Sequence, residues 1–218
     1  MPETLQSILC SETWVWDPNG SCQITFDKSG TGKLICRSEA SVFIAAEFDW
    51  ELASPTSPAA AALSAIAVDP ASPTHLVTLP LTITLTKRRI PYLGDFATSR
   101  VLRLNEDLLH DSAFAPRTYA VRVERGDFLS TPDTGSSQTQ QRELPKFTPR
   151  FALRLVFDAS PYPPAEAWRD PDGAPASFKV WEFTEFCGRP CGTVADSGGA
   201  SSGGWGLGKI LGGLTGRS

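Results

Sequence analysis

The hydrophobic residues of this chain recur at every second position in several stretches. The alternation is clearest in 47–52, 79–86 and 150–157, where apolar and polar side chains take turns. A period of two places successive side chains on opposite faces of a β-strand, so that one face of each strand can be buried. The pattern predicts an antiparallel β protein that encloses an apolar interior.

Further strands are expected where similar runs lie between turn residues. Together with the stretches above, the expected strands are 13–16, 21–26, 33–38, 42–52, 78–86, 118–124, 150–157 and 178–186. The first three are separated by Asp17-Pro18-Asn19-Gly20 and by Gly30-Thr31-Gly32, whose residues favour tight reversals. Eight antiparallel strands suffice to close an up-and-down barrel, whose interior is filled by side chains or holds one small ligand.

The remaining segments predict short helices, an insertion and a tail. Helical turns are expected in 105–110 and 165–169, and residues 1–10 are either a short helix or a frayed lead-in. The segment 53–76 is rich in Ala, Ser and Pro and predicts a flexible insertion, while 193–218 is rich in Gly and Ser and predicts a disordered tail. We expect 1–192 to form a single β-barrel domain, because a chain of 218 residues suits one all-β core.

Composition and charge narrow the classes of function. The chain is 41% hydrophobic and carries six Trp and twelve Phe, enough for one well-filled core. Its net charge is −4 and its basic residues are scattered, which argues against nucleic acid as a partner. The N-terminal residues lack the pattern of a secretion signal, and no stretch approaches the ~18 apolar residues of a membrane span. We expect a cytoplasmic protein without a membrane span.

The cysteines and histidines give no sign of a metal site or a cofactor. The five cysteines are an odd number and are expected to be reduced thiols. Cys187 and Cys191 have three residues between them, whereas redox and zinc motifs favour two. His75 and His110 stand outside any recognisable nucleophile or metal motif. The sequence therefore predicts no metal and no cofactor.

Two groups of charged residues could carry chemistry, although each also has a structural explanation. Glu47, Asp49 and Glu51 share one face of a strand and could form a general acid/base pair, but alternation predicts a solvated outer face for them. The run Lys87-Arg88-Arg89 could clamp an anionic group at the barrel mouth, but a short basic run after a strand is commonly just solvated.

Aromatic side chains complete the candidate ligand site. Those in the expected strands either pack the interior solid or line a cavity for an apolar ligand. With the basic run meeting the polar head of a ligand at the rim, the candidate ligand-binding residues are Trp14, Trp16, Phe48, Trp50, Lys87, Arg88, Arg89, Tyr119 and Phe151.

The first hairpin carries a family resemblance. Trp14-Val15-Trp16, a turn, and then Phe26 with Gly30-Thr31-Gly32 resemble the first hairpin of lipocalin-like (calycin) barrels, in which a Trp near the start of strand one plugs the closed end. Stretches similar to 41–50, 86–91, 151–164 and 181–187 also occur in an uncharacterised family of fungal proteins. The first resemblance implies a lipocalin-like barrel, whereas the second transfers no mechanism.

These observations lead to one expected architecture and three functions. We expect an all-β, lipocalin-like, antiparallel up-and-down barrel of about eight strands with short helices in its loops. The leading function is an intracellular, non-catalytic binding protein that holds a small apolar or amphipathic ligand in the barrel. The alternatives are an adaptor with a solid barrel, which binds a protein partner through its loops or tail, and a small barrel isomerase or cyclase. A filled interior with an exposed apolar patch favours the adaptor, and inward-pointing carboxylates and arginines favour the enzyme.

Overall fold

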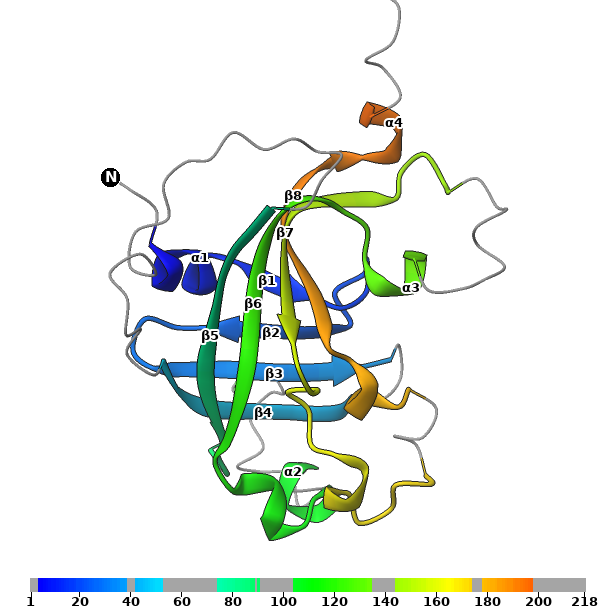
Figure 1. The fold of residues 1–218 in the computed structure, drawn as a ribbon. Helices are drawn as coiled ribbons and strands as arrows, with labels where there is room; N and C mark the ends of the chain where they lie inside the picture. The colour runs from blue at the N-terminus through cyan, green and yellow to red at the C-terminus, as the bar shows by residue number, and fades with distance from the viewer. Residues whose placement is uncertain are drawn as a thin grey trace, which may run out of the picture.

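A computed structural model describes residues 4–38, 42–52, 74–88, 90, 104–134, 144–173 and 178–197. Within them, strands β1 to β8 form one closed barrel in sequence order, and every neighbouring pair is antiparallel (Figure 1). The strands are β1 (Thr13–Val15), β2 (Cys22–Phe26), β3 (Thr31–Arg37), β4 (Val42–Leu52), β5 (Thr74–Leu85), β6 (Arg117–Phe128), β7 (Pro149–Phe157) and β8 (Glu185–Thr193). The expected all-β, eight-stranded, up-and-down architecture is confirmed.

Short helices occupy the connections, as expected from the sequence. They are α1 (Leu5–Ser11), α2 (Leu104–Leu108), η3 (Asp111–Phe114), α3 (Thr131–Thr134), η5 (Ala165–Ala167), η7 (Val180–Glu182) and α4 (Val194–Ser197). Figure 1 shows β2, β3 and β4 crossing the view from side to side, with β5 and β6 passing over them from top to bottom. Because successive strands alternate in direction, the connections divide between two ends of the barrel. One end holds α1 and the β2–β3 turn, and we call it the α1 end; the other holds the β1–β2 turn and the β7–β8 connection, and we call it the distal end.

Helix α1 begins at a capped residue and buries one face. Thr4 and Ser7 exchange side chain to backbone hydrogen bonds of 2.9 and 3.1 Å, which satisfies two amides of the first turn. Leu5, Ile8 and Leu9 follow at helical spacing and are all buried in the main core. The helix therefore lays an apolar stripe against the barrel at the α1 end.

The alternation along the strands sets the two faces of the barrel wall. On β4, Phe48 and Trp50 are buried whereas Asp49 and Glu51 are exposed, as the sequence predicts. The same parity holds on β5 and β6, so that the predicted interior positions lie in one core: Phe48, Trp50, Leu81, Ile83, Leu85, Tyr119, Val121, Val123, Leu153, Leu155 and Phe157. A slip of one residue in any register would expose a whole row of them, so burial fixes the pairing.

The turn between β2 and β3 requires glycine for two separate reasons. Gly30 has a φ of +85°, a conformation that side chains rarely allow. At Gly32, an added Cβ would stand 2.3 Å from the ring of Phe48 and 2.4 Å from the carbonyl of Thr25. The Gly30-Thr31-Gly32 run thus allows the chain to reverse and lets the Phe48 ring cross directly over the backbone of β3.

The β7–β8 connection covers the distal end with aromatic side chains. The buried Tyr162 donates its hydroxyl to the carbonyl of Ile35 at 2.8 Å. Phe183 stacks on Trp16 with ring centroids 3.7 Å apart, and the indole of Trp168 donates to the carbonyl of Pro163 at 3.0 Å. These contacts join the connection to the β1–β2 turn, to β3 and to itself, and close this end of the core.

Two predicted boundaries need correction. The last strand is not 178–186: Lys179 has a φ of +46° and starts the turn η7, and β8 instead runs through Gly188 and Pro190, which pairs with Phe151 across an irregular register. Strand β5 begins at Thr74, inside the segment expected to be a flexible insertion. The rest of that insertion, and 198–218 of the expected tail, lie outside the described residues.

The expectation of five reduced thiols is wrong for one pair. Cys22 and Cys36 face each other directly on the antiparallel strands β2 and β3, with Cα atoms 4.0 Å apart, and they form a disulfide. Both sulfurs lie inside the core, with residue exposures of 1% and 0%. Cys10, Cys187 and Cys191 form no disulfide among the described residues. Sequence spacing could not reveal the pair, because it depends on the register of the two strands.

Candidate functional site

The aromatic residues of the predicted ligand site divide between the core and one end. Trp14, Phe48, Trp50 and Tyr119 belong to the main core cluster, with exposures of at most 6%. Burial raises the pKa of the Tyr119 hydroxyl above its usual value. Trp16 is only partly buried and lies at the distal end. Four of the six predicted aromatic residues are thus brought together in the interior.

Phe151 is buried, but it belongs to another cluster. It packs with Phe128 and Cys187 in a small group separate from the main core. Register irregularities occur beside it, between Arg150 and Phe151 on β7 and between Arg125 and Phe128 on β6. The burial alternation of β7 nevertheless continues through Phe151, so the side chain is buried as predicted, but it packs in this separate cluster rather than with Phe48 and Trp50.

Inward side chains of all eight strands pack closely in the barrel interior. Each of the eight strands contributes at least one residue with 0% exposure: Trp14, Ile24, Leu34, Phe48, Leu81, Val121, Leu155 and Phe186, in the order β1 to β8. A void wide enough for water would leave accessible surface on the side chains around it. Around these residues the barrel interior therefore has the close packing of a protein core.

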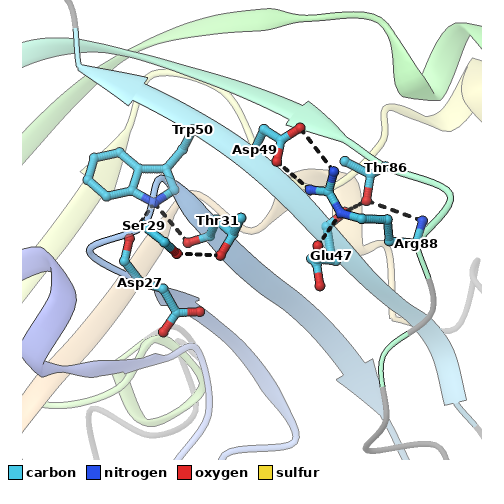
Figure 2. Close-up of polar contacts among 8 residues, drawn as sticks. All are labelled: Asp27, Ser29, Thr31, Glu47, Asp49, Trp50, Thr86 and Arg88. Atoms are coloured by element: carbon cyan, nitrogen blue, oxygen red, sulfur yellow. Dashed lines mark hydrogen bonds and ion pairs between the residues drawn. The ribbon is translucent and has the colours of Figure 1, made fainter.

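The basic run after β5 lies on the outside of the barrel. Arg88 forms ion pairs with Glu47 and Asp49, and hydrogen bonds to Asp49 and Glu47 raise the pKa of its guanidinium (Figure 2). Lys87 pairs with Asp111 at 2.9 Å, and this ammonium lowers the pKa of that carboxyl. Arg89 lies outside the described residues. The predicted cationic rim is therefore engaged by acidic side chains of the protein itself.

The register between β4 and β5 explains the pairing of Arg88. Thr86 follows the last paired residue of β5 and donates both its amide and its hydroxyl to the carbonyl of Glu47, at 2.8 and 3.0 Å. Figure 2 shows the two carboxylates gathered around Arg88, while the Trp50 indole turns toward the β2–β3 turn. The carboxylates of β4 face outward, as alternation predicts, and the arrangement expected of a barrel enzyme is not present among them.

A second charged network lies on the outer face of β6, β7 and β8. Glu124 has a side chain only 10% exposed and receives hydrogen bonds from Arg122 at 2.6 Å and from Arg154 at 2.8 Å. Arg154 also reaches Glu185 at 3.2 Å and lies over the ring of Phe128. Each carboxylate oxygen of Glu124 thus accepts a hydrogen bond from an arginine. We therefore interpret the network as structural.

The seam between the first and last strands is held by an ion pair. Strands β1 and β8 share the register pair Val15 and Cys187. Beside it, Arg189 donates to the Glu12 carboxylate through two nitrogens, at 2.8 and 2.7 Å, and the Glu12 side chain is only 11% exposed. Both nitrogens reach the same oxygen, Oε1, and this charged contact joins the two edges of the sheet where few backbone hydrogen bonds do so.

Sequence reasoning missed a depression at the α1 end. It has a volume of about 460 Å³ and is lined by Gln6 of α1, Lys28 and Ser29 of the β2–β3 turn, and Trp50, Glu51 and Leu52 of β4. We call it the α1-end depression. No motif marks these residues, because they come from three elements that only the barrel topology brings together.

The described residues offer neither a metal-binding cluster nor a membrane-spanning helix. No group of three or more His, Cys, Asp or Glu residues there could hold a metal ion. No helix in the same part of the chain is long and apolar enough to cross a membrane. In comparisons with known proteins, no family model, no curated protein and no solved structure matches this chain.

Proposed function

We propose that this protein is a non-catalytic interaction module: an adaptor whose barrel is a solid scaffold and whose surface binds a partner protein. The observation that carries the proposal is the filled interior, to which all eight strands contribute residues without accessible surface. A carrier of an apolar ligand needs a cavity that buries most of the ligand. The adaptor needs only a rigid wall that presents its loops.

One exposed aromatic side chain supports the same function. Phe147 is 79% exposed and is the exposed large hydrophobic residue of the described chain. Its segment is held in place, because Val194 donates to the carbonyl of Thr148 at 3.0 Å and Ala195 to that of Lys146 at 2.8 Å. Aromatic side chains presented on a fixed backbone are typical anchors of protein interfaces. We propose Phe147 as such an anchor.

The closed α1 end also supports the proposed kinship with lipocalin-like barrels. Trp14 is fully buried there and donates its indole N–H to the carbonyl of Leu9 at 3.2 Å. It packs closely on β8, since an added Cβ at Gly188 would stand 3.0 Å from the Trp14 ring. This agrees with the plugging role that the resemblance implies, while the filled interior distinguishes the proposed function from ligand carriage.

The first test asks whether the barrel takes up an apolar ligand. Titration with cis-parinaric acid should give no saturable fluorescence change with the wild-type protein. Phe186→Ala with benzene as the probe, followed by NMR, serves as the matched control, because removing a fully buried ring opens an apolar void of about that size in the same barrel. Saturable binding to the wild type would overturn the adaptor and restore the carrier.

The second test asks whether the surface binds a partner. Tagged wild-type protein and Lys146→Ser should retain the same proteins from a cell extract, and Phe147→Ser should lose them. Lys146 is the matched control because it neighbours Phe147 on the same segment and its backbone carbonyl keeps its hydrogen bond in the variant. If all three proteins retain the same partners, Phe147 is not the anchor.

A further inference from the structure

The α1-end depression has walls that are fixed before any ligand arrives. The indole of Trp50 donates to the carbonyls of Asp27 and Thr31, at 3.2 and 2.9 Å (Figure 2). The Trp50 amide donates to the carbonyl of Gly30 at 2.8 Å. Within the turn, the amide of Asp27 donates to the carbonyl of Thr31 at 2.7 Å. On the other side, the α1 helix is held by its cap and its buried face. A preorganised wall lowers the entropic cost of binding.

The charged side chains of the depression differ from those elsewhere on the barrel wall. Lys28 and Glu51 both line it and are exposed, and among the described residues neither has a hydrogen-bond or ion-pair partner. On the same face of β4, Glu47 and Asp49 are both engaged by Arg88. The Gln6 amide is likewise without a partner in the described chain. The concave surface thus presents a free cation, a free carboxylate and a free amide together.

We propose that the α1-end depression binds a small zwitterionic molecule, one that carries an ammonium and a carboxylate group. The Lys28 ammonium would hold the ligand carboxylate, and the Glu51 carboxylate would hold the ligand ammonium. A ligand with a single charge would pair with only one of these two groups and would leave the other without an opposite charge. Leu52 and the edge of Trp50 offer apolar contact for the rest of the ligand, and the volume of about 460 Å³ falls within the usual range of small-molecule sites.

The experiment uses ligands that share one side chain and differ only in charge. L-leucine is the zwitterion, N-acetyl-L-leucine retains only the carboxylate, and L-leucinamide retains only the ammonium. 6-Aminohexanoate tests a longer spacing of the two charges. Binding is followed by two-dimensional amide NMR of the full chain. We expect one of the zwitterions to bind saturably, with a dissociation constant of about 1 mM or tighter and shifts centred on residues 6, 28–30 and 50–52. The single-charge analogues should bind about tenfold more weakly or not at all.

Variants then assign the two charges. Lys28→Met should weaken the zwitterion about tenfold and remove its advantage over leucinamide, while Glu51→Gln should remove its advantage over N-acetyl-leucine. Lys33→Met is the matched control, because Lys33 is an exposed lysine of β3 that does not line the depression. The proposal is overturned if neither zwitterion binds, if N-acetyl-leucine binds as well as leucine, or if Lys33→Met has the same effect as Lys28→Met. None of these outcomes depends on the partner proposed for Phe147.

Discussion

At the two ends of the barrel, the buried aromatic side chains Trp14 and Tyr162 donate hydrogen bonds of very different sequence range. At the α1 end, Trp14 donates to the carbonyl of Leu9, five residues before it in the sequence. At the distal end, Tyr162 reaches the carbonyl of Ile35, 127 residues away, and Phe183 stacks on Trp16. Closing a short loop costs less chain entropy than closing a long one, so the hydrogen bond of Trp14 can form from local sequence, whereas the contacts of Tyr162 and Phe183 require the assembled barrel. The comparison predicts that each end responds to its own set of substitutions.

The largest single-residue effect is expected at the α1 end, from Trp14→Ala. The side chain has no exposed surface, so its removal should lower the free energy of unfolding by about 3–5 kcal/mol. The measurement is urea unfolding followed by circular dichroism. Trp181→Ala at the distal end is the control and should cost clearly less, because Trp181 is only partly buried against the core. Equal losses from both variants would contradict the view that one indole closes the α1 end.

The second largest effect is expected from removing the disulfide, which lies toward the distal end of β2 and β3. Its cysteines are 14 residues apart, and breaking such a loop should cost about 3 kcal/mol. The double variant Cys22→Ala, Cys36→Ala measures this loss by urea unfolding. Counting thiols in denatured, unreduced protein should give three rather than five, corresponding to Cys10, Cys187 and Cys191. Five titratable thiols in freshly prepared protein would show that the pair is reduced.

A smaller, local effect is expected from Tyr162→Phe. The variant keeps the ring but leaves the carbonyl of Ile35 without its hydrogen bond, at a cost of about 1–3 kcal/mol. Hydrogen exchange should quicken in 158–183 and around Ile35, while amides of α1 keep their wild-type rates. Faster exchange throughout α1 would show that the two ends are not independent.

The same tyrosine should make the distal end sensitive to alkali. Burial raises the pKa of Tyr162 well above its usual value, so the folded protein holds this proton more tightly than the unfolded chain. The stability is fully present below pH ~10, the usual tyrosine pKa, and falls as the pH rises above it. Tyr162→Phe should flatten the fall without abolishing it, because burial raises the pKa of Tyr119 in the same direction. An unchanged pH profile would rule out Tyr162 as its source.

The smallest effect is expected from the outer wall, which belongs to neither end. In Arg88→Met the lost ion pairs involve a guanidinium that is 49% exposed, so the midpoint of urea unfolding should barely move and any shift should vanish at high salt. Arg154→Met is the contrasting variant, because it removes a partner of the mostly buried Glu124 and should destabilise the protein more. A larger loss from Arg88→Met than from Arg154→Met would reverse this ranking.

The sequence predicted those parts of the fold in which local pattern and tertiary burial agree. Strand β4 has the predicted bounds, since the apolar run 42–46 continues directly into the alternation of 47–52. Strand β8 was misplaced because Gly188 and Pro190 are poor strand formers, and their strand exists only through pairing with β7. The apolar residues around Val180 instead belong to the β7–β8 connection, which covers the distal end.

The candidate site was predicted less well than the fold. Alternation placed Phe48 and Trp50 inside and their acidic neighbours outside, which the structure confirms. It could not show that Arg88 returns to Glu47, because that contact depends on the register between β4 and β5. The α1-end depression was missed for the same reason: Gln6, Lys28 and Glu51 become neighbours only when a helix, a turn and a strand end meet.

The ion pair between Glu12 and Arg189 has a consequence for folding during synthesis. The two residues are 177 positions apart, and the barrel can close only after β8 has left the ribosome. Until then, β1 lacks its neighbour on one side, and the growing sheet exposes an open edge whose free amides and carbonyls can pair with another chain. Chains that stall before residue 185 would keep that edge permanently. Such fragments should aggregate readily and depend on chaperones, whereas the finished barrel has no edge to offer.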